Sequence, residues 1–340
     1  MAVMEARSVD DIPRGPEWQY EPKWDGFRCL LIRSGDEVEL WSKSGQSLGR
    51  YFPDLIASAL ELKAARFVLD GEIVVPQDGG FSFDDLLQRI HPAASRVKKL
   101  AAETPALLLV FDLLADPRDG QLAAQPMSER RPALEAFAKA QFKGHPTFRL
   151  SPAVTDIKVA AKWLAQAGGG CDGVIAKRID LPYQSGNRDG MQKIKHYRSA
   201  DCVIGGFRYA SAKLKGRDVV GSLLLGLYDD EGRLNHVGFT SGLKQAEKPA
   251  LTEKLEKLIG GKGFTGNAPG GPSRWSTDRS AQWQPLKPKL VVEVCYDHVS
   301  AGRFRHGTSL LRWRPDKAPT QCTMDQLEQK SADPMKLLKG

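Results

Sequence analysis

The tetrapeptide Lys23-Trp24-Asp25-Gly26 puts a potential nucleophile two residues before a carboxylate and a turn-forming glycine. A lysine amine attacks only after it has lost its proton, and the pKa of a free lysine is about 10.4. Desolvation and neighbouring cations both favour the neutral amine. Lys23 would therefore need a partly dry, cationic pocket to react at neutral pH. Alone the tetrapeptide is a weak signal, because a surface lysine before a turn gives the same letters.

Further short motifs follow it along the chain and combine lysines with acidic residues. Phosphoryl transfer needs this combination, since cations neutralise phosphate and carboxylates bind a divalent metal. The motifs are Ser42-Lys43-Ser44-Gly45, Leu69-Asp70-Gly71-Glu72, Phe111-Asp112, Asp172-Gly173-Val174-Ile175-Ala176-Lys177, Lys193-Ile194-Lys195 and Arg314-Pro315-Asp316-Lys317. The spacing of Lys193 and Lys195 places both on one face of a strand. A P-loop sequence is absent, which excludes that class of nucleotide-binding enzyme.

The elements that must position these residues alternate between strands and helices over the first 200 residues. Apolar runs predict a hairpin over 27–33 and 37–42, with further strands over 67–76, 106–114, 173–178 and 191–197. Amphipathic patterns predict helices over 82–91, with Ser82 as the N-cap, and over 127–141, opened by Ser128. This order predicts an α+β fold built on antiparallel sheets rather than a βαβ repeat.

The pattern changes after about residue 200, where short strands separated by turns surround one helix over 250–260 and precede a Gly/Pro-rich loop over 266–274. Several strands with one helix predict a small Greek-key β-barrel such as an OB-fold. We therefore expect an adenylation or nucleotidyltransferase domain over 1–200, an OB-fold domain over 201–320 and a C-terminal tail over 321–340.

The composition of the chain indicates how many domains it can form, the state of its cysteines and the charge of its partner. The 340 residues suffice for two domains, and neither a secretory leader nor a membrane-spanning apolar run is evident. The five cysteines are scattered without CxxC spacing, which indicates reduced thiols in a cytoplasmic protein rather than disulfides or a cysteine-rich zinc site. Residues 201–340 hold 22 Lys and Arg against 15 Asp and Glu, whereas residues 1–200 hold 27 against 26. The basic excess thus lies in the C-terminal part and suits a polyanion such as DNA.

The ordered series of motifs resembles the covalent nucleotidyltransferase superfamily, which contains DNA ligases, RNA ligases and mRNA capping enzymes. Within it the chain is most similar to compact bacterial ATP-dependent DNA ligases of the ligase C type, with the ligase domain of ligase D close behind. The stretches that carry the closer resemblance are YEPKWDGFR, RIHPAASRV, DGVIAKR, GSLLLGLYDD and RFRHGTSLLRWRPDK.

The resemblance implies ATP as substrate and roles for particular residues. Lys23 matches the nucleophile that carries AMP, and Asp25 would orient it. Lys177, Lys193 and Lys195 match the lysines around the phosphates and should lower the pKa of Lys23. Glu72 and Asp172 match the acidic residues that contact the ribose or hold Mg²⁺, with Mn²⁺ as an alternative. Asp172 is one methylene shorter than the family's usual glutamate, so a water could bridge it to the metal.

The remaining matches concern nucleotide binding. Glu21 matches the adenine contact through its backbone, Arg28 and Arg50 lie where relatives bind ribose and phosphate, and Phe111 matches the ring that stacks on the base. Lys43 replaces the usual arginine and cannot bind phosphate bidentately. Arg314 and Lys317 match the element that orients pyrophosphate when the OB domain closes. Sequence-independent contacts with the DNA backbone are expected from basic residues of the barrel, namely Arg208, Lys213, Lys215, Arg303, Arg305 and Arg312.

We thus expect an ATP-dependent DNA ligase that seals nicked duplex DNA in repair, most simply as a monomer in the cytoplasm at the nucleoid. Without the extra DNA-binding domain of larger ligases, it should grip DNA weakly and depend on repair partners such as a primase-polymerase or Ku. The alternatives are an RNA ligase, a capping-type enzyme that uses GTP, and a degenerate DNA-binding scaffold without catalysis. NAD-dependent ligases are disfavoured because they add a cysteine-rich zinc module.

Overall fold

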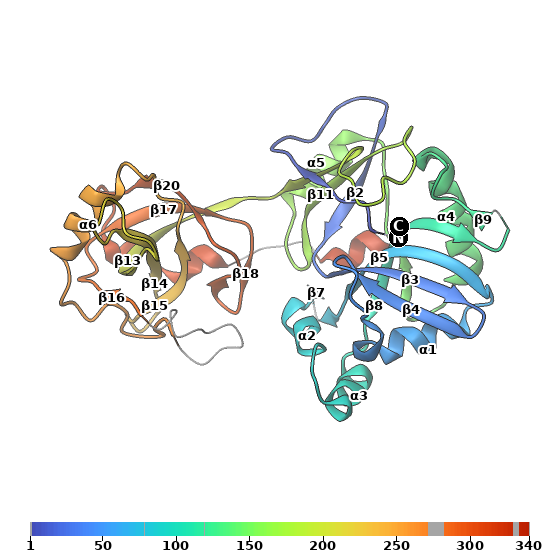
Figure 1. Cartoon of the computed structure of the whole chain (residues 1–340), viewed down its shortest axis with the longest axis horizontal. Helices are drawn as coiled ribbons and strands as arrows, with labels where there is room; N and C mark the ends of the chain where they lie inside the picture. Colours follow the sequence, from blue (N-terminus) through green and yellow to red (C-terminus); the bar gives the residue numbers. More distant parts are fainter. Residues whose placement is uncertain (1, 78, 119, 271–281, 329–332, 340) are drawn as a thin grey trace. The chain divides into compact units, whose positions relative to one another are not determined.

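A computed structural model describes residues 2–77, 79–118, 120–270, 282–328 and 333–339. Its contacts divide the chain into two units (Figure 1). The first unit comprises residues 1–196 and 330–340, and the second comprises residues 197–329. Among the described residues, no helix has the length and apolar character needed to cross a membrane.

The first sheet of the first unit has the strand order β1-β12-β11-β2. Its strands are β1 (Arg7–Ser8), β12 (Met191–Lys195), β11 (Cys171–Arg178) and β2 (Trp18–Trp24). The two antiparallel pairs are β2 with β11 and β11 with β12, while β1 runs parallel to β12. One face of this sheet buries Trp18, Tyr20 and Val174 against Trp163 of α5 (Ile157–Ala165). The opposite face is left for the polar side chains of the same strands.

The second sheet of this unit has the order β10-β8-β5-β3-β4, with β9 paired to β8. Its strands are β3 (Phe27–Ser34), β4 (Glu37–Ser42), β5 (Arg66–Val74), β8 (Leu107–Asp116), β9 (Gly120–Gln121) and β10 (Phe148–Leu150). One face packs into the largest apolar cluster with residues of α1 (Pro53–Glu61) and α4 (Met127–Gln141). The predicted hairpin is therefore confirmed as β3 and β4, and the strand predicted over 67–76 is β5 followed by the short β6 (Pro76–Gln77).

Smaller elements complete the first unit. They are η1 (Gly49–Tyr51), β7 (Gly80–Phe81), α2 (Phe83–Gln88), α3 (Ala94–Glu103) and η4 (Pro334–Lys339). The Ser82 side chain accepts a hydrogen bond from the backbone N–H of Asp85, which confirms it as the N-cap of α2. The prediction for Ser128 was wrong, because α4 begins one residue earlier at Met127. Its N-cap is Pro126, which has no side-chain oxygen to offer.

The second unit is built on a curved ladder with the order β15-β14-β13-β17-β20. Its elements are β13 (Arg198–Tyr209), β14 (Val220–Tyr228), β15 (Leu234–Thr240), α6 (Lys248–Glu256), β16 (Gln284–Pro285), β17 (Val291–Tyr296), β18 (Val299–Ser300), β19 (Arg303–Phe304), β20 (Ser309–Trp313), η2 (Pro319–Gln321) and η3 (Met324–Leu327). A single parallel bridge between Thr240 and Thr308 joins the outer strands. Among the described residues, this one bridge thus links the two ends of the sheet. The outer strands are not paired along their length, as they would be in a fully closed barrel.

The observed division differs from the predicted domain limits in two places. The change of unit falls between residues 196 and 197, whereas the predicted limit at 200 cuts through β13. The predicted tail over 321–340 is shared between the units. Cys322 and Leu327 are buried in the core of the second unit, and Leu337 and Leu338 pack on the first. Part of the predicted loop over 266–274 lies outside the described residues.

Candidate active site

The alternation of side chains in β2, β11 and β12 assembles one wall of a pocket. Successive residues of a strand point to opposite faces, and directly paired residues share a face. Tyr20, Ala176 and Ile194 face the core. Their neighbours along each strand therefore point to the opposite face of the sheet. On that face the paired residues of β2, β11 and β12 form three rows across the sheet. The first row is Gln19, Lys177 and Met191, the second is Glu21, Ile175 and Lys193, and the third is Lys23, Gly173 and Lys195.

A β-bulge in β11 brings Asp172 to Lys23. Cys171 pairs with Trp24 and Gly173 pairs with Lys23, so Asp172 is the extra residue on its strand. The Lys23 Nζ donates to Asp172 Oδ2 at 2.8 Å. Gly173 has a φ of 152°, and a Cβ there would lie 2.0 Å from the carbonyl oxygen of Ile194. The glycine therefore permits both the bulge and the close approach of β12.

The second sheet supplies the opposite wall through β3, β5 and β8. Arg28 and Glu72 are direct partners across β3 and β5. The guanidinium of Arg28 lies over the Phe111 ring, with its Cζ 4.5 Å from the ring centroid. Glu72 accepts a hydrogen bond of 3.1 Å from the backbone N–H of Gly26, which ties it to the turn after Lys23.

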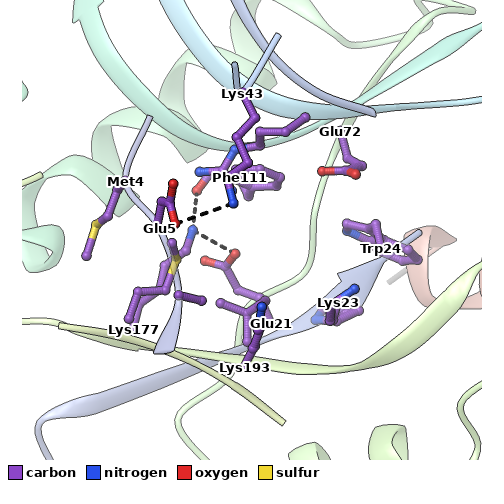
Figure 2. A pocket seen from close by; sticks show the side chains of 15 residues that line it. Met4, Glu5, Glu21, Lys23, Trp24, Lys43, Glu72, Phe111, Lys177 and Lys193 are labelled. Carbon is purple, nitrogen blue, oxygen red and sulfur yellow. Dashed lines mark hydrogen bonds and ion pairs between the residues drawn. The ribbon is translucent and has the colours of Figure 1, made fainter. Parts of the chain in front are cut away.

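The two walls enclose a pocket whose lining contains most of the predicted residues (Figure 2). Figure 2 labels Lys23 near Glu72 at one end and Lys177 near Phe111 and Glu5 at the other. The predicted residues in the lining are Glu21, Lys23, Arg28, Lys43, Glu72, Phe111, Lys177 and Lys193. The rest of the lining is Met4, Glu5, Ala6, Pro22, Trp24, Ile175 and Met191. The pocket thus offers an aromatic ring, cations and a lysine beside a carboxylate.

The protonation of Lys23 differs from the sequence-based expectation. We expected the surrounding lysines to lower its pKa. Burial does act in that direction, but the negative charges of Asp172, Asp25 and Glu72 outweigh it, and the pKa of Lys23 is raised. The expectation was wrong for the nucleotide-free protein, because the bulge sets a carboxylate against the ammonium group. Activation of the amine thus requires that this carboxylate be engaged elsewhere or accept the proton.

Two further pKa shifts describe the charge around Lys23. Burial raises the pKa of Glu72 to about 7, although the charges of Arg28 and Lys23 oppose the shift. Burial also lowers the pKa of Lys193, and the nearby charges of Lys23, Lys195, Lys43 and Arg188 add to it. Of these cations, Lys23, Lys43 and Lys193 line the pocket and give it the positive charge that a bound polyphosphate needs.

Lys177 is nearly fully buried and contacts the ring end of the pocket. Its Nζ donates to the Phe111 carbonyl at 3.2 Å, pairs with Glu21 Oε2 at 2.8 Å and lies 4.7 Å from the Phe111 ring centroid. Gln19 donates to the other oxygen of Glu21 at 2.9 Å. The Glu21 carboxylate is therefore committed to Lys177 and Gln19.

Four predicted residues of the first unit lie outside the pocket lining. Asp172 contacts Lys23 directly, and Asp25 is buried with its charge close enough to shift the pKa of Lys23. Lys195 stands beyond Gly173 in the row that begins at Lys23. Arg50 donates to the carbonyl of Pro92 at 2.9 Å and stacks on Tyr51, so it is not brought to the other predicted residues.

In the second unit, Arg314 and Lys317 meet on one carboxylate. Arg314 Nη1 donates to both oxygens of Asp201, at 2.8 and 3.0 Å, and Lys317 Nζ donates to Oδ2 at 2.7 Å. Asp316 holds the other side of the Arg314 guanidinium. Sequence reasoning missed Asp201, and no local signal marks it, since it stands 113 residues before Arg314.

Sequence reasoning also missed the segment before β1. Met4, Glu5 and Ala6 line the pocket, and Glu5 pairs with Lys43 at 3.5 Å and with Arg188 at 3.1 Å. These residues carry no recognisable motif, and their position depends on pairing between distant parts of the chain. The one signal in the sequence is the length of the chain before Lys23, which is enough for this segment to pack close to the pocket.

Comparison with known proteins identifies the family. The family model of the ATP dependent DNA ligase domain matches residues 3–195, and that of the ATP dependent DNA ligase C terminal region matches residues 216–317. The chain is 45% identical to DNA ligase C2 of Mycolicibacterium smegmatis, over 96% of this chain and 94% of that protein. It is 42% identical to DNA ligase C of Mycobacterium tuberculosis, with the same coverage of each chain.

Two further similarities concern a larger relative and the fold. The multifunctional non-homologous end joining DNA repair protein LigD of Mycobacterium tuberculosis is 33% identical over 91% of this chain and 37% of that protein. A solved structure of a Lig E DNA ligase covers 92% of this chain and 99% of its own, with a TM-score of 0.56 and 18% identity. The predicted α+β nucleotidyltransferase domain followed by an OB-fold domain is confirmed. The chain belongs to the family of ATP-dependent DNA ligases.

Proposed function

We propose that this chain seals nicks in duplex DNA and that Lys23 carries AMP during the reaction. The observation that supports the assignment of Lys23 is its ammonium group, which lies in the pocket 2.8 Å from Asp172 with Arg28 and Phe111 on the opposite wall. An aromatic ring suits the base, a cluster of cations suits the phosphates, and the amine is the nucleophile between them.

In the first step, neutral Lys23 Nζ attacks the α-phosphorus of ATP. The bond from that phosphorus to the oxygen bridging to the β-phosphate breaks, and pyrophosphate leaves with the electron pair. Asp172 Oδ2, within hydrogen-bond distance of Nζ, accepts the proton that the amine must lose. Lys193 and Lys195 neutralise charge on the phosphates. Lys177 was expected to do the same, but its contacts with Glu21 and Phe111 place it where it can contact the base.

The site also suits a divalent cation, for which Asp172, Glu72 and Asp25 are the candidate ligands. Their carboxylates surround Lys23 closely enough to raise its pKa, and hard oxygen donors are what Mg²⁺ or Mn²⁺ requires. A bound cation would supply charge neutralisation on the α-phosphate. It would also engage the Asp172 carboxylate, which otherwise stabilises the protonated form of Lys23.

In the later steps the DNA reacts. An oxygen of the 5′-phosphate at a nick attacks the phosphorus of the adenylate and breaks its bond to Nζ. The 3′-hydroxyl then attacks the activated 5′-phosphorus and releases AMP. Arg314 and Lys317 serve the first step by orienting the pyrophosphate, and their shared partner Asp201 keeps both cations together.

We further propose a role in DNA repair, as the names of the LigD relatives indicate for those proteins. The protein would act as a monomer on nicked DNA at the nucleoid and would rely on a primase-polymerase or on Ku for recruitment. Basic residues of the second unit would hold the DNA backbone. Their contacts would weaken with salt and show no sequence preference.

The experiment that tests the function uses duplex DNA with a single nick and with either DNA or RNA on each side of it. Incubation with ATP and Mg²⁺ should seal the DNA nick and release AMP. Sealing with GTP and not ATP, or of RNA ends alone, would contradict the proposal. The absence of sealing by protein that does form the adenylate would point to a different acceptor.

A further inference from the structure

A tyrosine outside the pocket lining begins a chain of buried hydrogen bonds that reaches into the pocket. Tyr183 stands in the segment after β11 and is 8% exposed. Its hydroxyl donates to Asp70 Oδ2 at 2.6 Å. Asp70 is completely buried and also accepts from both Nε and Nη2 of Arg28, the latter at 2.7 Å. Tyr183 is thus connected to a pocket residue through one carboxylate.

Every group in this chain of hydrogen bonds has a partner. The Tyr183 oxygen gives its proton to Asp70 and accepts the backbone N–H of Met4 at 2.9 Å. Asp70 accepts three hydrogen bonds in all. Loss of the hydroxyl would leave the Met4 N–H without its partner and would reduce the bonds to the Asp70 carboxylate from three to two. In a buried site such a loss is not compensated by water.

The carboxylate sets the plane of the Arg28 guanidinium. Two donors of Arg28 bind the two oxygens of Asp70, which fixes the group in one orientation. In that orientation the guanidinium lies over the Phe111 ring at 4.5 Å. Arginine has about 2 kcal/mol of rotamer entropy to lose. A partner that holds it before the ligand arrives therefore improves binding.

The ring of Tyr183 has a separate set of contacts. It packs with Val3, Met4, Leu30, Leu114 and Met191, and the guanidinium of Arg130 lies 5.7 Å from its centroid. A phenylalanine would keep these contacts, because only the hydroxyl takes part in the hydrogen bonds to Asp70 and Met4. The apolar and the polar contributions of this residue can therefore be separated by one substitution.

We propose that Tyr183 is a positioning residue of the nucleotide pocket, which acts through Asp70 to hold Arg28 against Phe111. The inference rests on the proposed function, since it assigns the pocket to ATP. The inference extends the proposed function by adding two residues, Tyr183 and Asp70, that do not line the pocket. The segment before β1 takes part as well, because the backbone N–H of Met4 donates to the Tyr183 hydroxyl.

The test measures the Kd for α,β-methylene-ATP, which cannot transfer AMP. Binding thus reports on Tyr183 even if Lys23 proves not to be the nucleophile. Tyr183→Phe should raise the Kd about five- to tenfold, the scale of one typical intramolecular hydrogen bond. Tyr209→Phe is the matched control, since its hydroxyl also donates to a carboxylate, that of Glu256 at 2.9 Å, in the second unit. Its Kd should stay within about twofold of wild type.

Thermal unfolding identifies a temperature at which every variant is folded, and binding is measured there. A double-mutant cycle with Asp70→Asn then separates positioning from a merely structural role. The inference predicts that Tyr183→Phe has little further effect on the Kd once Asp70 is changed. It would be overturned by an unchanged Kd in Tyr183→Phe, or by effects of the two substitutions that multiply independently.

Discussion

Replacement of Asp172 with asparagine removes the carboxylate that contacts Lys23 and should lower the pKa of its ammonium group. In the nucleotide-free protein this pKa is raised, because the carboxylates of Asp172, Asp25 and Glu72 outweigh the effect of burial. The asparagine keeps the size and a hydrogen-bond acceptor, so the main change is the loss of one negative charge. The amine should therefore become neutral, and reactive, at a lower pH.

The magnitude follows from the distance of 2.8 Å between Lys23 Nζ and Asp172 Oδ2. The attraction between unit charges at that distance is roughly 1.5 kcal/mol with the dielectric constant of water and roughly 6 kcal/mol at an effective value of about 20. Both side chains are less than one-fifth exposed, at 19% and 13%, so the water value is a lower bound. One pKa unit corresponds to about 1.4 kcal/mol. The pKa of Lys23 should therefore fall by at least about one unit.

The assay labels amines briefly at a series of pH values in protein freed of AMP, nucleotide and metal. Mass spectrometry then gives the modified fraction of the peptide that contains Lys23. The midpoint should lie at least about one pH unit lower in Asp172→Asn than in wild type. Asp180→Asn is the matched control, because Asp180 pairs with Arg178 at an exposed position. A midpoint that is unchanged or higher in Asp172→Asn would refute the argument.

Other predictions test the core, the base site and the second unit. Arg130→Met should reduce the free energy of unfolding by about 3–5 kcal/mol, since it leaves the buried Asp112 without its ion partner. Lys99→Met, which breaks an exposed ion pair with Glu103, should change the free energy of unfolding by less than about 0.5 kcal/mol. Equal losses in urea titrations would count against this reasoning. Phe111→Leu should weaken binding of α,β-methylene-ATP about tenfold by calorimetry because the stacking ring is lost, and unchanged binding would remove Phe111 from the base site. Burial lowers the pKa of His236 to about 3, so only the unfolded chain gains a proton below about pH 6.5. Stability should therefore fall by about 1.5 kcal/mol from pH 6.5 to 5 relative to His236→Leu, and parallel pH profiles of the two proteins would contradict the shift.

The placement of Lys193 and Lys195 on one face of β12 could be predicted because its information is local. The two lysines are two residues apart, and that spacing alone places both on one strand face. The strand β2, which carries Glu21 and Lys23, was not predicted, and only the order of the motifs along the chain indicated that these residues belong to one site. The stacking role of Phe111 was expected from the family resemblance alone, because its place at the end of an apolar strand is equally typical of core packing.

The protonation of Lys23 could not be predicted, because it depends on distances across the sheet. The letters around Asp172 indicate a turn or a metal ligand, and only the bulge reveals that its carboxylate contacts the amine. Asp201 and Tyr183 were missed for a related reason. Their partners stand 113 residues away in both cases, and no local pattern marks a side chain whose role depends on so distant a contact.

The identity of the nucleophile is tested most directly by locating AMP on the protein. AMP-free protein is incubated with α-labelled ATP and Mg²⁺, wild type beside Lys23→Ala, and digested peptides are sequenced by mass spectrometry. We predict an AMP adduct on Lys23 of the wild type that is labile to acid and stable to alkali, as a phosphoramidate is, and that nicked DNA removes, and no adduct on the variant. An adduct on another residue, or equal labelling of the variant, would contradict the account.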